Sequence, residues 1–369
     1  MPHDFEHQQD LPAGRSFLKV DAASNTPRKA PAAGVRRREL ALDDYVQGVI
    51  DHDRAILGRC ITLVESRNHQ HQLLAREVLT RLMHRTGGAR RIGITGVPGV
   101  GKSTFIETLG CNLVDAGNKV AVLAVDPSSG VSGGSILGDK TRMANLSAKP
   151  EAFIRPSPAG KTLGGVASKT RETMLICEAA GFDVILIETV GVGQSETVVA
   201  DMTDFFLALM LAGAGDELQG IKRGLLELVD MIAINKADGD NKRKALRAAA
   251  EYQNALKYMH AGDEDTGDWA PPVMTCSAAE NTGVDDIWQR IAHRVDRLRE
   301  DGRLETKRRS QQLRWMWALI DEQLGQALRE HPQVKSLVRQ TEQQVQHGEL
   351  PATAAADAVL HAFLSEREA

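Results

Sequence analysis

The sequence predicts an α/β fold, a mostly parallel doubly wound sheet of the P-loop NTPase type with helices before and after it. Short apolar runs alternate with helical patterns between residues 89 and 303, which is typical of a sheet covered by helices on both faces. Residues 96–104 fit the phosphate-binding loop G-x-x-x-x-G-K-[ST] between a strand pattern and a helix pattern. A second motif, N-K-x-D at residues 235–238, follows a later apolar run.

The polar segment at residues 1–40 lacks apolar periodicity, so we expect a disordered leader. It contains basic residues, but its acidic residues and the missing apolar core disfavour a targeting peptide, which stays the alternative. Residues 41–88 have a helical pattern, with Asp53 as a predicted cap. We expect His69 and His71 to lie on a surface helix, because no cysteine or carboxylate cluster completes a metal site.

Seven apolar runs predict the strands of the sheet. They cover residues 91–95, 119–125, 153–156, 182–188, 205–211, 230–235 and 273–276. Helices are predicted from residue 105 and over residues 166–180. Because ligands bind at the carboxyl edge of such sheets, the loops after these strands are the candidate site.

The strand pattern stops after about residue 303, and residues 304–369 read as a helical arm. Helices are predicted over 308–328, 334–345 and 351–364. Trp315 and Trp317 are two residues apart and so cannot share one helical face. We expect one to face the sheet domain and one a second copy of the chain, which makes this a dimerisation arm. The alternative is a helical cap within one subunit.

The overall composition is that of a soluble globular protein. The 369 residues carry 45 basic and 49 acidic side chains, for a net charge of −4. This balance disfavours a dominant nucleic-acid or membrane surface, and no apolar run reaches the roughly 18–20 residues of a membrane span. The four cysteines lie far apart, as expected for thiols in a reducing compartment, and we predict a cytoplasmic protein.

The phosphate-binding loop has residue types that match its chemistry. Its glycines allow a tight backbone turn whose N–H groups face an anion, next to the positive end of the following helix. We expect Lys102 to reach the β- and γ-phosphates and Ser103 to bind Mg²⁺. The predicted nucleotide contacts in this loop are Gly96, Val97, Pro98, Gly99, Val100, Gly101, Lys102, Ser103 and Thr104.

The N-K-x-D motif predicts GTP over ATP. The Asp238 carboxylate can accept from both N1–H and the N2 amine of guanine, whereas adenine offers it no such pair. Asn235 should brace the loop, and Lys236 should lie along the ring. The next strand ends in Cys276, Ser277 and Ala278, which fit the short loop whose backbone N–H meets guanine O6.

The loop after the 182–188 strand departs from the common D-x-x-G. Glu188 takes the place of the acid that holds Mg²⁺, and the Gly191 N–H is placed to sense the γ-phosphate. Many GTPases orient the attacking water with a glutamine just after this glycine. Here that position is Val192, and the nearest glutamine is Gln194. We therefore expect slow hydrolysis that a partner accelerates.

Further candidates lie on loops at the same sheet edge. Asp126 and Asp139 could coordinate metal or position water, and the alternatives are a turn before Pro127 and a helix cap. With Ser103 and Glu188 they form the predicted metal set. The Gly-rich loop 211–222 is predicted to be a switch in which Lys222 approaches the nucleotide or a partner. The alternative is an ordinary solvated connection.

Several stretches together resemble the MeaB family, the bacterial relatives of the methylmalonic aciduria type A protein. The resemblance covers roughly residues 42–365, and the S-I-L-G-D-K-T-R-M run and the glutamate-containing loop are specific to that family. The stretches are 96–104, Asp126-Pro127-Ser128-Ser129, 134–143, 188–196 and 235–238.

The resemblance implies a homodimeric, metallochaperone-like GTPase that binds adenosylcobalamin-dependent methylmalonyl-CoA mutase. Such proteins gate loading of the intact cofactor and protect or reactivate the mutase, and adenosylcobalamin is expected on the partner only. The resemblance also implies GTP/GDP and Mg²⁺ as ligands. The matching residues are Lys102 and Ser103 for phosphate and Mg²⁺, Asp126, Asp139 and Glu188 for Mg²⁺, Asp238 for guanine and 211–222 for a mutase-responsive switch.

Two other functions stay open. Close relatives carry the name of a transport-linked ATPase or kinase of lysine, arginine and ornithine uptake, which conflicts with the guanine motif. A nickel-insertion GTPase would share the fold, but such proteins usually have a Cys or His cluster near the N-terminus, which this chain lacks. The sequence does not select between methylmalonyl-, isobutyryl- and ethylmalonyl-CoA mutases as the enzyme served.

Overall fold

The computed structural model describes residues 40–125, 143–156, 163–189, 195–213, 223–259 and 269–365. Residues 1–40 and 41–369 form separate units, and the second contains all the elements below. Residues 1–39 of the predicted leader lie outside the described residues.

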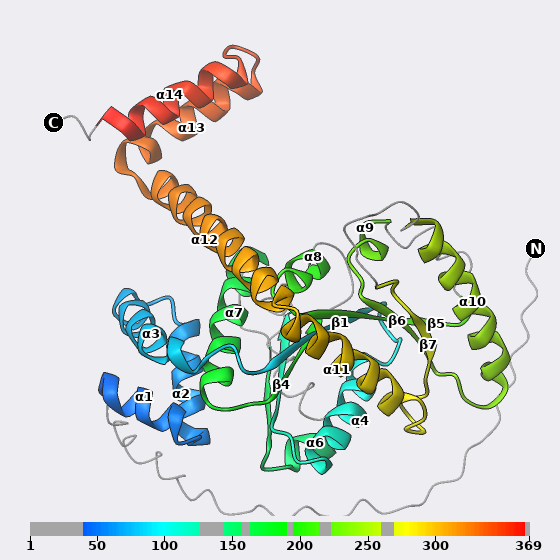
Figure 1. Cartoon of the computed structure of the whole chain (residues 1–369). Coiled ribbons are helices and arrows are strands. Elements are labelled where there is room, and N and C mark those ends of the chain that lie inside the picture. Colours follow the sequence, from blue (N-terminus) through cyan, green and yellow to red (C-terminus); the bar gives the residue numbers. More distant parts are fainter. Residues whose placement is uncertain are drawn as a thin grey trace, which may run out of the picture. The chain divides into compact units, whose positions relative to one another are not determined.

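A seven-stranded parallel sheet forms the centre of the second unit (Figure 1), which confirms the predicted fold class. The strand order is β3-β2-β4-β1-β5-β6-β7. The strands are β1 Arg90–Gly96, β2 Val120–Val125, β3 Ala152–Arg155, β4 Val184–Thr189, β5 Phe205–Leu211, β6 Met231–Asn235 and β7 Val273–Thr275. β1 lies between β4 and β5, so Ile92 is paired with Leu186 on one side and Phe205 on the other.

The helices cover both faces of the sheet. They are α4 Lys102–Asp115, α6 Ala144–Ala148, α7 Leu163–Ala179, α8 Ser195–Ala200, α9 Arg223–Leu226, α10 Lys242–Met259 and α11 Val284–Glu300, with a 3₁₀ turn η2 Gly239–Asn241. Alternate strand residues such as Ile92 and Ile94 pack with α4 and α11 in one apolar cluster. The residues between them face the other side, where a Cβ added to Gly93 would lie 3.0 Å from Val199 of α8.

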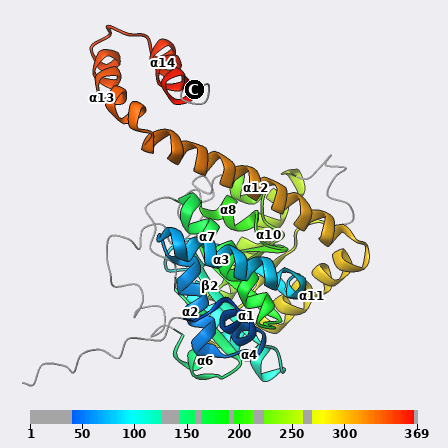
Figure 2. The same cartoon turned by 90° about the vertical axis from the view of Figure 1, so that its left-hand side faces the viewer.

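Three helices precede the sheet: α1 Leu42–Ile50, α2 Arg54–Glu65 and α3 His69–Leu82, the last followed by the 3₁₀ turn η1 Met83–Arg85. Each of them packs against α7 (Figure 2). The predicted cap is confirmed, because the Asp53 side chain accepts from the N–H groups of Ala55 at 2.8 Å and Ile56 at 3.1 Å. His69 and His71 are exposed on α3, as predicted.

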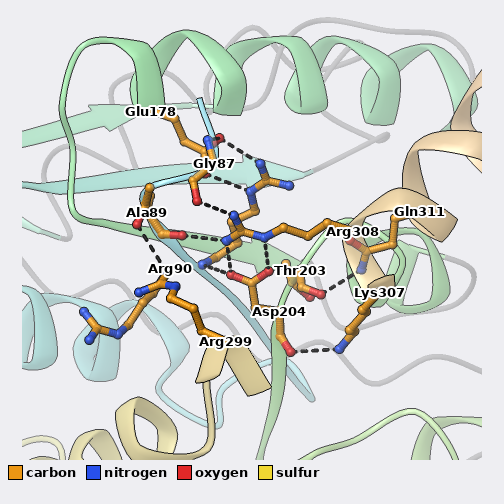
Figure 3. A network of polar contacts seen from close by, with 12 residues as sticks. Gly87, Ala89, Arg90, Glu178, Thr203, Asp204, Arg299, Lys307, Arg308 and Gln311 are labelled. Atoms are coloured by element: carbon orange, nitrogen blue, oxygen red, sulfur yellow. Dashed lines mark hydrogen bonds and ion pairs between the residues drawn. The ribbon is translucent and has the colours of Figure 1, made fainter. Parts of the chain in front are cut away.

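A buried carboxylate, Asp204, lies just before β5 at the amino end of the sheet (Figure 3). It accepts from the backbone N–H of Arg91 at 2.8 Å. Arg308 donates to it through Nε at 2.8 Å and through Nη2 at 2.6 Å, and Lys307 donates to its backbone oxygen at 2.8 Å. Since both cations belong to α12, Arg303–Glu330, this helix is bound to the starts of β1 and β5.

A second buried ion pair extends this network to α7. Arg91 contacts Glu178 through two hydrogen bonds, of 2.9 and 2.7 Å, and both side chains are almost fully buried. Glu178 also accepts from the Gly87 N–H at 3.0 Å. Arg308 donates to the carbonyl oxygens of Gly87 and Ala89, both at 2.6 Å. The segment before β1 is thus held between α7 and α12 (Figure 3).

The last helices are α12, α13 Pro332–Gln346 and α14 Ala352–Leu364. The start of α12 packs on the sheet domain, where Gln311 donates to the Thr203 carbonyl at 2.8 Å. Trp315 lies against Arg171 of α7, whose guanidinium is 5.7 Å from the ring centre, whereas Trp317 is 60% exposed. The expected division between an inward and an outward tryptophan is therefore observed. Among the helices that the structure describes, none combines the length and the apolar character of a membrane span.

Removing the Arg308 side chain should destabilise the fold strongly. An Arg308→Ala substitution leaves the Asp204 carboxylate buried without its charged partner, which should lower the free energy of unfolding by about 3–5 kcal/mol. Chemical denaturation followed by circular dichroism measures this change. The matched control is Arg247→Ala, which breaks the exposed Arg247–Glu251 pair on α10 and should cost only about 0.3–0.5 kcal/mol. Equal losses in the two variants would contradict the importance of the buried network.

Candidate nucleotide-binding site

The loop between β1 and α4 has a backbone that only glycine accommodates at two positions. Gly96 has φ 150°, and a Cβ there would lie 2.4 Å from the Leu209 carbonyl oxygen of β5. Gly101 has φ 95°, and a Cβ there would lie 2.8 Å from Nδ2 of Asn235. The loop is therefore pressed against β5 and against the strand end that carries the N-K-x-D motif.

Lys102 begins α4 and is buried beneath its own loop. Its ammonium donates to the carbonyl oxygens of Gly96 at 2.7 Å and of Val97 at 3.4 Å. Burial lowers the pKa of this ammonium, while the negative charges of Glu188 and Glu196 oppose that effect. The predicted phosphate lysine is thus held within the loop, with two carboxylates acting on its charge.

Ser103 and Glu188 lie together at the carboxyl end of the central strands. The Ser103 hydroxyl donates to Oε1 of Glu188 at 3.3 Å. Glu188 belongs to β4, where it is paired with Ile94 of β1 and Ala124 of β2. A hydroxyl beside a carboxylate is a donor set that suits a hard cation such as Mg²⁺.

Asn235, at the end of β6, joins the two loops that the sequence assigns to phosphate and base. Its Nδ2 donates to the Val100 carbonyl of the phosphate-binding loop at 2.9 Å. Its Oδ1 accepts from the Ala278 N–H at 3.1 Å and from the Cys276 thiol at 3.6 Å. The side chain is 2% exposed, so both loops are bonded through one buried carboxamide.

The other two motif residues are also held in place. Lys236 has φ 58°, and its ammonium donates to the Gly99 carbonyl at 2.8 Å, so its side chain crosses to the phosphate-binding loop. Asp238 accepts from the Ser277 hydroxyl at 2.5 Å through Oδ2. That contact orients the carboxylate predicted to read guanine.

The structure therefore brings together the predicted residues of the phosphate loop, residues 235–238 and residues 276–278, along with Glu188. The predicted residues Asp126, Asp139, Gly191, Gln194 and Lys222 lie outside the described residues. Within the described part of the chain, no three His, Cys, Asp or Glu side chains gather as a metal site. Two of the four predicted ligands are outside that part, so the metal set stays a prediction.

One residue near the phosphate loop was not predicted from the sequence. Glu196, in the first turn of α8, is buried, and its charge acts on Lys102. In the sequence it is visible only as an acidic residue eight positions after Glu188. The six-residue helix that contains it is too short for a pattern of apolar residues to indicate which side chains are buried. The burial of this carboxylate shows itself only in three dimensions.

Relatives with known names match the chain over most of its length. A protein of Caulobacter vibrioides is 57% identical over 324 residues, covering 88% of this chain and 98% of the relative. The mitochondrial methylmalonic aciduria type A homolog of Mus musculus is 44% identical over 339 residues, covering 89% of this chain and 81% of the relative. Among solved structures, the crystal structure of a LAO/AO transport system kinase has a TM-score of 0.69 at 39% identity, covering 87% of this chain and 96% of that chain.

The family model described as "Methylmalonyl Co-A mutase-associated GTPase MeaB" matches residues 57–333. This stretch contains the whole sheet, the phosphate-binding loop and the N-K-x-D loop. The resemblance inferred from the motifs is thereby confirmed, and the chain belongs to the MeaB family of GTPases.

Proposed function

We propose that this protein binds and hydrolyses GTP at the site between residues 96–104 and 235–238, and that it serves methylmalonyl-CoA mutase as a chaperone. The observation that carries the nucleotide assignment is the Asn235 carboxamide, bonded to Val100 on one side and Ala278 on the other. This contact sets the phosphate loop and the base loop at a fixed spacing, as one nucleotide requires. Membership in a family of GTPases supports the same assignment.

On binding, the phosphates compete with internal contacts of the loop. Lys102 would exchange the Gly96 carbonyl for phosphate oxygens, and the backbone N–H groups of residues 96–104 would supply the remaining donors. Asp238, fixed by Ser277, would accept from the guanine N1–H and N2 amine. The Ala278 N–H now donates to Asn235 and would be shared with guanine O6.

Mg²⁺ fits the residues at the end of β4. The Ser103 hydroxyl and the Glu188 carboxylate would hold it, with Asp126 and Asp139 as the proposed further acids. When bound, the ion neutralises charge on the phosphate oxygens. The protein's own contribution is to place a hydroxyl and a carboxylate at 3.3 Å, facing the end of the phosphate loop.

The proposed partner is adenosylcobalamin-dependent methylmalonyl-CoA mutase, which would carry the cobalamin itself. GTP binding and hydrolysis would gate cofactor loading and protect or reactivate the mutase, with residues 211–222 as the switch that the family resemblance implies. The family description and the methylmalonic aciduria name of the mouse relative support this partner. A transport role is the alternative, supported by the name of the structurally similar kinase, but it calls for ATP, which Asp238 disfavours.

The helical arm is the proposed dimer contact. Leu313, Trp317 and Leu324 are 52–60% exposed and follow one another at spacings of four and seven, so they form one apolar stripe along α12. Trp315, which packs on α7, lies on the other side of the helix. An exposed apolar stripe of this kind marks a protein contact. The arm therefore supports the homodimer that the family resemblance implies.

Base specificity tests the nucleotide assignment. In Asp238→Asn, the new amide N–H meets the N2 amine of guanine, which is also a donor, whereas it can donate to the O2 of xanthine. The affinity for GTP should therefore fall by at least about tenfold, and the affinity for xanthosine triphosphate should rise. Titration with fluorescent GDP and competing triphosphates measures both changes. The control is Asp240→Asn, an exposed acid two residues away, which should keep GTP preference. Unchanged GTP affinity in Asp238→Asn would refute the assignment.

Coupling to the mutase tests the chaperone role. We expect slow GTP turnover alone, faster turnover with purified methylmalonyl-CoA mutase, and an affinity for the mutase that differs about fivefold or more between bound GDP and a non-hydrolysable GTP analogue. Phosphate release and surface plasmon resonance measure these effects. In Asp238→Asn, stimulation should move from GTP to xanthosine triphosphate. If the mutase changes neither turnover nor affinity, the chaperone role fails.

Light scattering after size exclusion tests the arm. Trp317→Glu places a charge in the apolar stripe of α12 and should convert dimer to monomer at micromolar concentration, because burying an unpaired charge is costly. Ala318→Glu adds the same charge outside the stripe, at another exposed position of α12, and should leave the dimer intact. A Trp317→Glu protein that stays dimeric would exclude this face as the contact.

A further inference from the structure

The start of α8 contains two adjacent buried polar side chains, each with an oxygen that has no hydrogen-bond partner in the described part of the chain. Ser195 is 2% exposed and Glu196 is 8% exposed. Among the described residues, neither the Ser195 hydroxyl nor Oε2 of Glu196 has a hydrogen-bond partner. A buried carboxylate oxygen without a donor is costly, so this arrangement becomes favourable when a further molecule donates to it.

Glu196 belongs to the first turn of α8, which lies toward the phosphate side of the sheet. α8 begins six residues after β4 ends and packs on β1, β4 and β5 (Figure 1), so its first turn lies at the carboxyl edge of the central strands. The negative charge of Glu196 acts on the Lys102 ammonium. No ion pair joins the two groups in the described part of the chain, because the ammonium donates to the carbonyls of the phosphate loop instead. The carboxylate therefore stands near Lys102 but is not neutralised by it.

The two carboxylates near Lys102 differ in their contacts. Glu188 accepts from Ser103, the hydroxyl proposed to bind Mg²⁺. Within the ranges that the structure describes, the buried Oε2 of Glu196 has no such contact and is open to a donor. Many GTPases use a glutamine to hold the attacking water, and valine at position 192 cannot do so. The sequence therefore has no side chain at position 192 that could accept a hydrogen bond from the attacking water. The buried carboxylate of Glu196, on α8, is such an acceptor.

We propose that Glu196 is a catalytic residue that accepts a hydrogen bond from the water attacking the γ-phosphate; this role rests on the proposed GTP hydrolysis. The water oxygen bonds to the γ-phosphorus, and the bond from that phosphorus to the β–γ bridging oxygen breaks, with its electron pair remaining on GDP. One water proton stays on the released phosphate, and the other passes through the Glu196 carboxylate to solvent. Glu196 holds the water and receives this proton.

Substitution of Glu196 in the full-length protein should separate turnover from binding. Glu196→Gln keeps the size of the side chain but weakens the acceptor, so single-turnover phosphate release should slow by about a hundredfold or more, with and without mutase. The GTP dissociation constant should stay within about threefold of wild type, since the water and not the nucleotide is contacted. Glu196→Asp, one methylene shorter, should also be slow. The control is Glu300→Gln, an exposed acid at the end of α11, which should match wild type.

Thermal unfolding distinguishes this role from a structural one. Glu196→Gln removes an unpaired buried charge, so its melting temperature should equal or exceed that of the wild type. Wild-type turnover in Glu196→Gln, or a loss of turnover that is matched by lost GTP binding or a lower melting temperature, would overturn the catalytic role alone. A wild-type protein that fails to hydrolyse GTP would overturn the proposed function, and the role of Glu196 with it.

Discussion

The buried carboxylate of Asp204 connects the central strand β1 to the helical arm that begins with α12. It holds the start of β1 through the Arg91 N–H and the start of α12 through Arg308. A charge with no exposed surface needs such donors, because removing it from water without them is costly. The same two strands carry the candidate site at their other ends: β1 leads into Gly96, and β5 approaches that glycine through Leu209. The helical arm and the phosphate loop are therefore joined by the same pair of strands.

The contacts between α12 and the sheet affect where the GTPase domain ends and the helical arm begins. A boundary at residues 303 and 304 follows from the end of the strand pattern and stays a prediction. The first turns of α12, however, bond to the sheet through Lys307, Arg308 and Gln311. From Leu313 onward the helix also exposes apolar side chains, among them Trp317 and Leu324. Removing the whole of α12 would thus disturb the sheet as well as any dimer, which is why single substitutions in the exposed stripe are the cleaner probe.

The strands and the phosphate loop could be predicted because their signals are local: apolar runs of four to seven residues and glycines at fixed spacing. Helical geometry predicted that Trp315 and Trp317 lie on different faces, but not which of them packs on α7. The Asp204–Arg308 contact could not be predicted, since 104 residues separate its partners and neither side chain looks unusual in the sequence. Asn235 was expected to brace the loop, but its bonds to Val100 and Ala278 depend on the strand order, in which β6 lies beside β7 and is separated from β1 by β5. Glu196 was missed for the same reason.

Charge balance links these features at the phosphate end of the sheet. Glu188 and Glu196 bring two negative charges to this region, and they are matched by Lys102 and by Lys236, whose ammonium donates to the Gly99 carbonyl. A triphosphate adds further negative charge, which attraction to these two lysines does not offset. Backbone N–H groups of the loop and a divalent cation beside Ser103 must supply the rest. A site built in this way binds nucleotide and cation together. A carboxylate can remain close to the phosphates only if a hydrogen-bond donor lies between the carboxylate and the phosphates. A water molecule held by Glu196 meets that requirement, which connects the cost of burying the acid to its place in the reaction.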